Sequence, residues 1–396
     1  MRTISLIILA ISVICAFGKH VDLPPPFNDD CVLSDGKNLY DQSKQFDVPW
    51  FTVDLDAPPH ERWKDIAIRY KVEMGEIIDM IEGLLDGIIP GIFNFIEKSM
   101  ADAAPRMPMP YRDEIQGIAD YSGLSLGKCV MFNIFYEVSS FCTSIVAQDP
   151  DGHIVHARNL DFGEFFGWNT TTHEWTIATQ LRKMLVNLNW KKNGAVLFKS
   201  ISFAGYSGIL SGMRPGAFSI TVDSRFAKPS GVHGTISWLL GHNQDIKWMA
   251  WLTRETLENC DNYVDAKNKL MGTPLLAAVY FILGGYNPWE GAIIARSDND
   301  TALLTELDKN AEDGWFVLET NYDKNKDPLF LDDRNTPGMA CMRKMSQNGV
   351  SFQGLFNVLS SRTNLNKATV YTALMDTKSG QVETYIQWCR GECWAW

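Results

Sequence analysis

The sequence has no histidine beyond residue 242. Its seven histidines stand at positions 20, 60, 153, 156, 173, 233 and 242. A papain-like cysteine hydrolase carries its base histidine far downstream of the nucleophile, in a region that has none here. A nucleophilic thiol in this chain therefore needs a base of another kind.

Long apolar runs are missing after the first residues. Arg2 followed by the apolar run from Ile4 to Phe17 is typical of a secretory signal peptide, which we assign to residues 1–18. No later stretch reaches about 18 uncharged apolar residues, the length that suggests a transmembrane helix. We expect a soluble protein in a lumen or outside the cell.

Positive charge is in deficit. The chain has 36 Lys and Arg against 47 Asp and Glu, a net charge of −11 and an isoelectric point near 5.2. This negative net charge argues against nucleic acid as a partner. It also argues against binding to an anionic membrane by charge alone. It suits a compartment of low pH. The 396 residues show no internal repeat or low-complexity tract and fit one compact enzyme with an attached segment.

Closely spaced cysteines are rare. With Cys15 in the signal peptide, seven of the 8 cysteines remain, and most should pair in an oxidising compartment. Cys389 and Cys393 stand close together, but no second close pair completes a zinc site. We expect a local disulfide there, and no metal or other cofactor.

The most informative stretch is residues 141–163. Cys142 opens a run that predicts a buried strand, residues 149–152 predict a turn, and a second strand starts at His153. The ends of such a hairpin lie side by side, so Arg158 and Asp161 should come close to Cys142. A lone cysteine is more often a small buried hydrophobe than a nucleophile. His153 and His156, three apart on a strand, should lie on opposite faces.

The residues before this hairpin predict a helical region. Residues 46–56 alternate as a strand does, and residues 60–100 predict helices broken at Pro90-Gly91, with a further helix at Asp113–Tyr121. The apolar side of residues 74–96 is either packed on the core or an apolar cover for a lipid enzyme. Gly123–Gly127 matches G-x-S-x-G but follows a helix, so we interpret it as a helix end and restart.

The residues after the hairpin predict mostly strands. The predicted strands are residues 175–178, 184–190, 195–204 and 218–222, and four further buried ones at 277–283, 292–295, 303–307 and 315–320. Residues 238–271 are largely helical. This order predicts an α+β fold in which two stacked antiparallel sheets lie between helical layers.

Two surface features follow the hairpin. Phe162, Phe165, Phe166 and Trp168 form an aromatic cluster that is either core or the mouth of an acyl-chain pocket. Asn169 and Asn299 stand in glycosylation sequons, which are expected on the surface of a secreted protein.

The string CTSIVAQDPDGHIVHARNLDFG, from Cys142 to Gly163, resembles the start of the mature catalytic chain of the acid ceramidases and of their relatives, the N-acylethanolamine-hydrolysing acid amidases. Similar stretches recur as SFAGYSGILSGMRPGAFSIT, AVYFILGG, ETNYDKNKDPLFLDDRNTP and the closing Cys389 to Cys393. Together they cover nearly the whole chain after residue 18. These families are N-terminal-nucleophile cysteine hydrolases, so the resemblance implies their αββα sandwich.

The resemblance also implies how the chain is processed. The precursor cuts itself between Phe141 and Cys142, which gives an alpha subunit of residues 19–141, mostly helical, and a catalytic beta subunit of residues 142–396. The freed α-amine of Cys142 then serves as the base. A disulfide between Cys31 and Cys341 holds the subunits together.

The same resemblance implies the roles of the site residues. Arg158 lowers the pKa of the amine, Asp161 orients the amine, Asn321 donates to the oxyanion, and Arg334 is a further cation that fixes polar neighbours. Where acid ceramidases carry a glutamate this chain has Ser224, beside Asp223. That departure concerns substrate preference and rate more than fold or nucleophile.

The expected activity is hydrolysis of N-acylsphingosine in a lysosome or after secretion, with a saposin-type activator and a lipid surface as partners. An N-acylethanolamine amidase is the alternative within the same chemistry. A non-catalytic lipid-binding protein with an uncut Cys142 is the alternative from another class.

Overall fold

The computed structural model describes residues 31–135, 141–162, 167–225, 234, 237–238, 241–242, 245–298, 300–329, 332–390 and 393. The predicted signal peptide, Phe165, Phe166 and Asn299 lie outside these residues.

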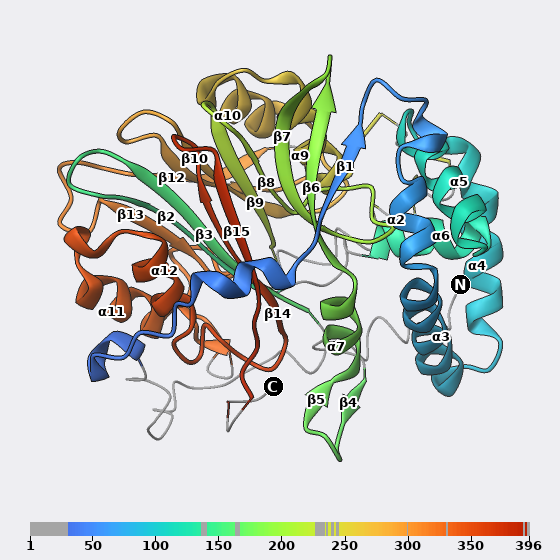
Figure 1. The fold of residues 1–396 in the computed structure, drawn as a ribbon, viewed down its shortest axis with the longest axis horizontal. Helices are drawn as coiled ribbons and strands as arrows, with labels where there is room; N and C mark the ends of the chain where they lie inside the picture. Colours follow the sequence, from blue (N-terminus) through green and yellow to red (C-terminus); the bar gives the residue numbers. More distant parts are fainter. Residues whose placement is uncertain are drawn as a thin grey trace.

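Two stacked sheets form the centre of the molecule (Figure 1). The larger has eight strands in the order β1-β6-β7-β8-β9-β10-β11-β12, and the smaller has five in the order β13-β2-β3-β14-β15. The strands of the larger sheet are β1 Trp50–Asp54, β6 Leu185–Lys192, β7 Ala195–Phe203, β8 Ser211–Arg214, β9 Phe218–Ser224, β10 Val279–Gly285, β11 Gly291–Arg296 and β12 Thr301–Glu306. Those of the smaller sheet are β13 Phe316–Glu319, β2 Phe141–Gln148, β3 Ile154–Asp161, β14 Thr369–Asp376 and β15 Gln381–Ile386.

Helices cover the outer face of each sheet. α9 (Met249–Asn259) and α10 (Tyr263–Gly272) pack on the larger sheet, and α11 (Asn335–Met345) and α12 (Phe352–Leu359) pack on the smaller one. The predicted αββα sandwich is therefore confirmed. One detail differs, because β1 pairs in parallel with β6, whereas the sequence predicted antiparallel sheets.

The N-terminal helices form a group at one end of the sandwich, at the right of Figure 1. They are α2 Lys64–Arg69, α3 Lys71–Ile88, α4 Ile92–Ala103, α5 Tyr111–Ser122 and α6 Leu126–Phe135. The predicted break falls between α3 and α4, where Gly91 adopts the left-handed backbone that glycine tolerates (φ 80°). The predicted apolar side of α3 buries Met74, Ile77, Ile78 and Ile81. Towards the break, Ile88 is 63% and Phe95 64% exposed, so this part of the apolar side faces outward.

Two predictions about single strands are also wrong. Residues 175–178 are not a strand: Trp175 ends the short strand β5 (Glu174–Trp175, paired with β4 Trp168–Asn169), and α7 (Thr176–Lys183) follows. Ile177, Ala178 and Leu181 are buried at helical spacing, and α7 packs against α3 and β14. β12 is a strand but not a buried one, because it forms the edge of the larger sheet.

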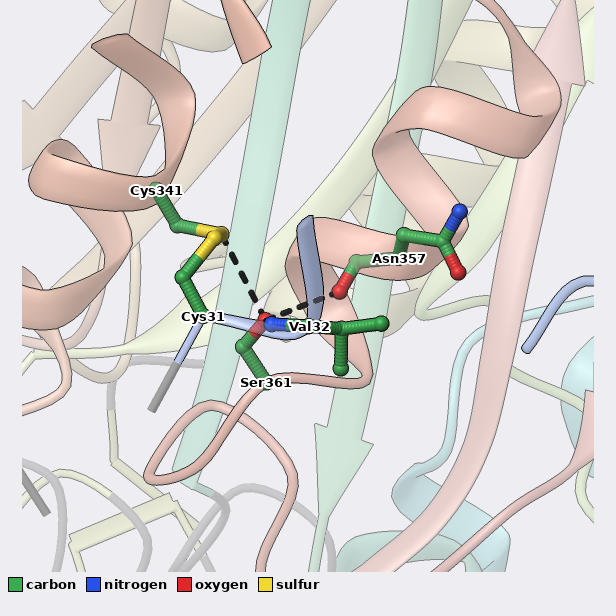
Figure 2. The surroundings of a disulfide bond; sticks show 5 residues. All are labelled: Cys31, Val32, Cys341, Asn357 and Ser361. Carbon is green, nitrogen blue, oxygen red and sulfur yellow. Dashed lines mark hydrogen bonds between the residues drawn. A yellow bond between two sulfur atoms is a disulfide. The ribbon is translucent and has the colours of Figure 1, made fainter. Parts of the chain in front are cut away.

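The segment before β1 runs along the smaller sheet and is tied to it (Figure 1). Cys31 is joined to Cys341 of α11. Figure 2 shows Ser361 beside this bond, where its hydroxyl accepts from the Val32 amide at 2.9 Å and donates to the Asn357 carbonyl at 2.9 Å. The disulfide therefore connects the two sides of the predicted cut. A second disulfide joins Cys389 and Cys393.

Candidate active site

Cys142 is the second residue of β2, and its side chain is fully buried. β2 and β3 form the predicted hairpin, in which Cys142 pairs with Leu160 and Phe141 with Asp161. Nη2 of Arg158 donates to the Cys142 sulfur at 2.5 Å. The hairpin thus brings the predicted cation to the predicted nucleophile.

The pleat of the hairpin separates two groups of residues, because residues paired across two strands point to the same face. Cys142, Ser144 and Arg158 point into the layer between the sheets, where Arg158 reaches the Leu210 carbonyl and Ser144 reaches Asp223 of β9. Asn159 and Asp161 point to the opposite face, towards the residues around α12. The thiol and the Asp161 carboxylate therefore belong to different faces of one hairpin.

The thiol lies in a buried, charged environment. Burial raises the pKa of Cys142 to about 12, and the Arg158 charge acts in the opposite direction. The same Nη2 of Arg158 lies 3.3 Å from Oδ1 of Asp223, whose pKa burial raises to about 6 against the pull of Arg158. The thiol and this carboxylate thus share one guanidinium nitrogen.

The backbone of Cys142 is held from the other side. Its amide donates to Oδ1 of Asn321 at 2.8 Å, and its carbonyl accepts from Nη1 of Arg334. Arg334 precedes α11, and its Nη2 also donates to Oδ1 of Asn321 at 2.9 Å. Asn321 follows β13 with a φ of 71°, a left-handed conformation that asparagine tolerates better than most residues. Asn321 and Arg334 together fix the peptide that starts at Cys142.

Asp161 lies beside this group. Its Oδ2 accepts from Nδ2 of Asn366 at 2.9 Å and lies 3.7 Å from Nη1 of Arg334. Its Oδ1 is buried and has no hydrogen-bond partner among the described residues. Burial raises the pKa of Asp161 to about 6, and the charge of Arg334 opposes that shift. A buried carboxylate oxygen without a donor is a ready acceptor for a new one.

The five residues proposed from the sequence therefore lie together, with one difference in orientation. Nδ2 of Asn321, the expected oxyanion donor, donates in this uncut chain to the carbonyl of Ser224 at 2.7 Å. Ser224 thus meets the site through its backbone. Sequence reasoning missed Ser144, Asn366 and Asp332, whose carboxylate holds Arg334. Asp332 stands in the LDDRNTP string that was already noted, whereas no pattern pointed to Asn366.

The other candidates lie outside this group. His156 is buried between the hydroxyls of Ser219 and Thr221, and burial lowers its pKa to about 3. His153 lies on the opposite side of β3, where it meets Asp376. Ser125 of the G-x-S-x-G string accepts from the Lys128 amide at the start of α6, which fits the interpretation as a helix restart.

Of the aromatic cluster, the structure describes Phe162 and Trp168, and these two differ in burial. Phe162 is buried, whereas Trp168 is 37% exposed and packs its ring on Trp175. Asn169 is partly exposed and accepts from the Thr171 amide at 2.9 Å.

Comparison with known proteins places the chain in a family. Residues 142–311 match the model of linear amide C–N hydrolases of the choloylglycine hydrolase family, and residues 46–107 match the model described as the beta subunit of N-acylethanolamine-hydrolyzing acid amidase. Human acid ceramidase is 40% identical over 99% of this chain and 98% of its own length, and the mouse enzyme is 38% identical over 98% of each. A solved Caenorhabditis elegans N-acylethanolamine-hydrolyzing acid amidase ortholog matches with a TM-score of 0.52 and 26% identity, over 62% of this chain and 99% of that one.

The fold and these matches define an N-terminal-nucleophile hydrolase, an enzyme that cleaves linear amides. Within that class, the full-length identity to the curated relatives shows that the chain belongs to the acid ceramidase family.

Proposed function

We propose that this enzyme hydrolyses the amide bond of N-acylsphingosine to sphingosine and a fatty acid, after cutting itself between Phe141 and Cys142. One observation carries the proposal: the Cys142 thiol faces a buried arginine, while its backbone nitrogen donates to Asn321, which Arg334 holds in turn. That nitrogen is the atom which the cut converts into an amine.

In self-cleavage, the thiolate of Cys142 attacks the carbonyl carbon of Phe141. The peptide bond breaks, a thioester forms, and water opens it. Residues 19–141 then form the alpha subunit and residues 142–396 the beta subunit. The disulfide between Cys31 and Cys341 keeps the two subunits linked (Figure 2).

In lipid hydrolysis, the α-amine of Cys142 takes the thiol proton. The pKa of an α-amine is ordinarily about 7.7–8.0, and the cations Arg158 and Arg334 favour its neutral form. The thiolate attacks the ceramide carbonyl, Nδ2 of Asn321 donates to the oxyanion, and the ammonium returns its proton to the leaving sphingosine nitrogen. Water then releases the fatty acid from the thioester with the amine as base.

Oδ1 of Asp161, which has no hydrogen-bond partner among the described residues, supports the role proposed for Asp161, because it offers an acceptor beside the future amine. Arg334 contacts the Cys142 carbonyl, Asn321 and Asp332, which supports a role in fixing the site.

A lysosomal location and help from a saposin-type activator belong to the same proposal. An isoelectric point near 5.2 suits an acid compartment. Among the described residues no helix is long and apolar enough to span a bilayer. Exposed Ile88 and Phe95 near the turn between α3 and α4 offer apolar surface towards a lipid aggregate or carrier. Sequons at Asn169 and Asn299 are the proposed glycosylation sites.

Mass spectrometry of the purified protein tests the first step. An amino-terminal Cys142 is expected in the wild type, whereas Cys142→Ala should give one uncut band at acid pH under reducing conditions. A normal two-chain pattern from Cys142→Ala would contradict the proposed self-cleavage. An uncut wild type would favour the non-catalytic lipid-binding protein.

The likeness to the solved amidase ortholog and to the amidase family model favours an N-acylethanolamine as the second candidate substrate. Acyl-chain burial contributes about 0.8 kcal/mol per methylene, and both substrates gain it equally, so discrimination comes from the amine side. Specificity constants for C12-ceramide and an N-acylethanolamine of matched acyl length should favour the ceramide, with detergent or saposin at acid pH. A clear preference for the ethanolamide would overturn the ceramide assignment and leave Cys142 as nucleophile.

A further inference from the structure

Self-cleavage requires a proton acceptor other than the α-amine that serves in lipid hydrolysis, because this amine does not exist before the cut. The Cys142 thiol must lose its proton before it attacks Phe141. In the uncut chain the nitrogen of Cys142 is an amide that donates to Oδ1 of Asn321, so it has no lone pair for a proton. His156 is separated from this step, because its ring nitrogens face Ser219 and Thr221. Another group has to act as the base in the first reaction.

The faces of the hairpin indicate where that base lies. Cys142 points into the layer between the sheets, whereas Asp161 points to the opposite face and meets Asn366. Across the layer, β9 directs Ser219, Thr221 and Asp223 at the hairpin. The Asp223 carboxylate therefore lies on the side of the hairpin to which the Cys142 thiol points.

The contacts of Asp223 bring it to the thiol. Nη2 of Arg158 lies 2.5 Å from the Cys142 sulfur and 3.3 Å from Oδ1 of Asp223. Ser144 donates to the same Oδ1 at 3.0 Å, and Thr221 donates to Ser144 at 2.9 Å. Oδ2 of Asp223 is buried and has no hydrogen-bond partner within the parts of the chain that the structure describes. One oxygen is held in place, and the other is open to a proton.

We propose that Asp223 accepts the thiol proton during self-cleavage, a role that rests on the proposed function above. The proton moves from the Cys142 sulfur to the Asp223 carboxylate, and Arg158 stays charged beside the new thiolate. The thiolate bonds to the carbonyl carbon of Phe141. The bond from that carbon to the Cys142 nitrogen breaks, and this nitrogen takes the proton back from Asp223. One water then hydrolyses the thioester, with the freed amine as base.

This role gives the cut a pH dependence. Arg158 of β3 and Arg334 before α11 lower the pKa of Asp223, and Asp161 of β3 raises it. In the described part of the chain, the other titratable groups near it are Cys142 of β2, Tyr280 of β10, Glu319 of β13 and Tyr371 of β14. Burial outweighs the cations and raises the pKa to about 6. A base acts in its ionised form, so the cut should speed up as the pH rises through about 6.

The test follows the cut over time in freshly purified precursor, from about pH 4 to about pH 8, by reducing gel. Asp223→Asn keeps the shape of the side chain without its basicity, and should slow the cut by about 100-fold or more and remove the rise near pH 6. Ser144→Ala removes a donor to the ionised carboxylate, which raises the pKa of Asp223. The increase in cleavage rate should therefore move to higher pH. Asp313→Asn is the control, because Arg343 binds that carboxylate at 2.8 Å. It should keep the wild-type profile.

A second readout separates a base from a residue that merely positions Arg158. Lipid hydrolysis is measured per molecule with an amino-terminal Cys142, counted by mass spectrometry. Loss of a base should slow the cut at least about tenfold more than hydrolysis, whereas loss of a positioning residue slows both equally. Equal slowing, or a retained rise near pH 6 in Asp223→Asn, overturns the proposal.

Two controls keep the outcomes distinct. If wild type is never cut, the proposed function fails, and the role of Asp223 fails with it for that separate reason. If Asp223→Asn does not fold, the Ser144→Ala profile decides: a shift to higher pH supports the proposal, and an unchanged profile overturns it.

Discussion

Glu114 of α5 joins the N-terminal helices to the catalytic part through a buried ionic contact. Its two oxygens accept from Nη1 and Nη2 of Arg254 of α9 at 2.5 and 2.7 Å. Arg62 and Trp63 donate to the same carboxylate at 2.9 and 3.0 Å. Glu114 precedes the proposed cut and Arg254 follows it, so this contact should hold the subunits together without a covalent bond.

Glu114→Gln keeps the shape and removes the charge. Losing one partner of a buried ion pair costs about 3–5 kcal/mol of unfolding free energy, because the other charge stays buried. Arg254 keeps a contact to Glu258 at 2.7 Å and lies 4.3 Å from the Trp190 ring. These contacts compensate part of the Arg254 charge. We therefore expect Glu114→Gln to lower the unfolding free energy by about 3 kcal/mol, the lower end of that range.

Glu76→Gln is the matched control. Glu76 of α3 lies 3.5 Å from Lys183 of α7, across the same two parts of the chain, but both side chains are exposed. An exposed pair contributes little to stability. The two variants carry the same substitution and differ in burial.

The pH dependence of the effect has a definite sign. Burial alone would raise the pKa of Glu114, but Arg254 outweighs it and the pKa is lowered. The stabilisation is therefore complete above the unfolded-state pKa, about 4.3, and is lost only as the pH falls through the lower folded-state value. The difference from wild type should persist at mildly acid pH.

Thermal unfolding at neutral pH and at about pH 5 measures the effect. Gel filtration of the cut protein in reducing agent adds a second measure: wild type and Glu76→Gln should elute as one complex at denaturant concentrations where Glu114→Gln separates. Equal melting temperatures for the two variants would refute the reasoning.

Two further predictions concern the subunit link and the site. Cys31→Ser should leave the cut fragments separate on a non-reducing denaturing gel, whereas wild type gives one band; one band from the variant would show another covalent link. Asp161→Asn should abolish most lipid hydrolysis by the cut enzyme, yet raise the stability of the uncut chain at neutral pH. The folded-state pKa of Asp161 is raised from 3.8 to about 6, so its ionised form costs about 3 kcal/mol above that range. This cost disappears as the pH falls below about 4, so calorimetry should show stabilisation at neutral pH and none at acid pH; equal stabilisation at both contradicts the pKa argument.

The hairpin and its contacts were predictable because they depend on local rules. The turn at residues 149–152 fixes the register of β2 and β3, and the register alone brings Arg158 and Asp161 back to the start of β2. α7 was not predictable from its first residues. The four residues 175–178 are too few for their apolar pattern to distinguish a strand from a helix. Its burial against α3 and β14 decides the outcome.

The role of Asp223 could not be predicted from its position in the sequence. Strand alternation shows that Asp223 and Ser224 point to opposite faces of β9. Which face meets the hairpin depends on how the two sheets stack, and the contacts of Thr221 with Ser144 and His156 fix that stacking. Asn366 likewise reaches Asp161 from a loop 205 residues away, a contact that no spacing rule contains.

The site is built for a charge that the uncut chain does not carry. An amide nitrogen has one N–H to donate, and the Cys142 amide gives it to Oδ1 of Asn321. An ammonium has three. Oδ1 of Asp161, buried and without a partner among the described residues, offers a second acceptor, and its raised pKa in the uncut chain should fall once a cation stands beside it. In the proposed mechanism the cut therefore converts Asp161 from a destabilising buried carboxylate into the counter-ion of the new amino terminus, which makes the reverse reaction unfavourable.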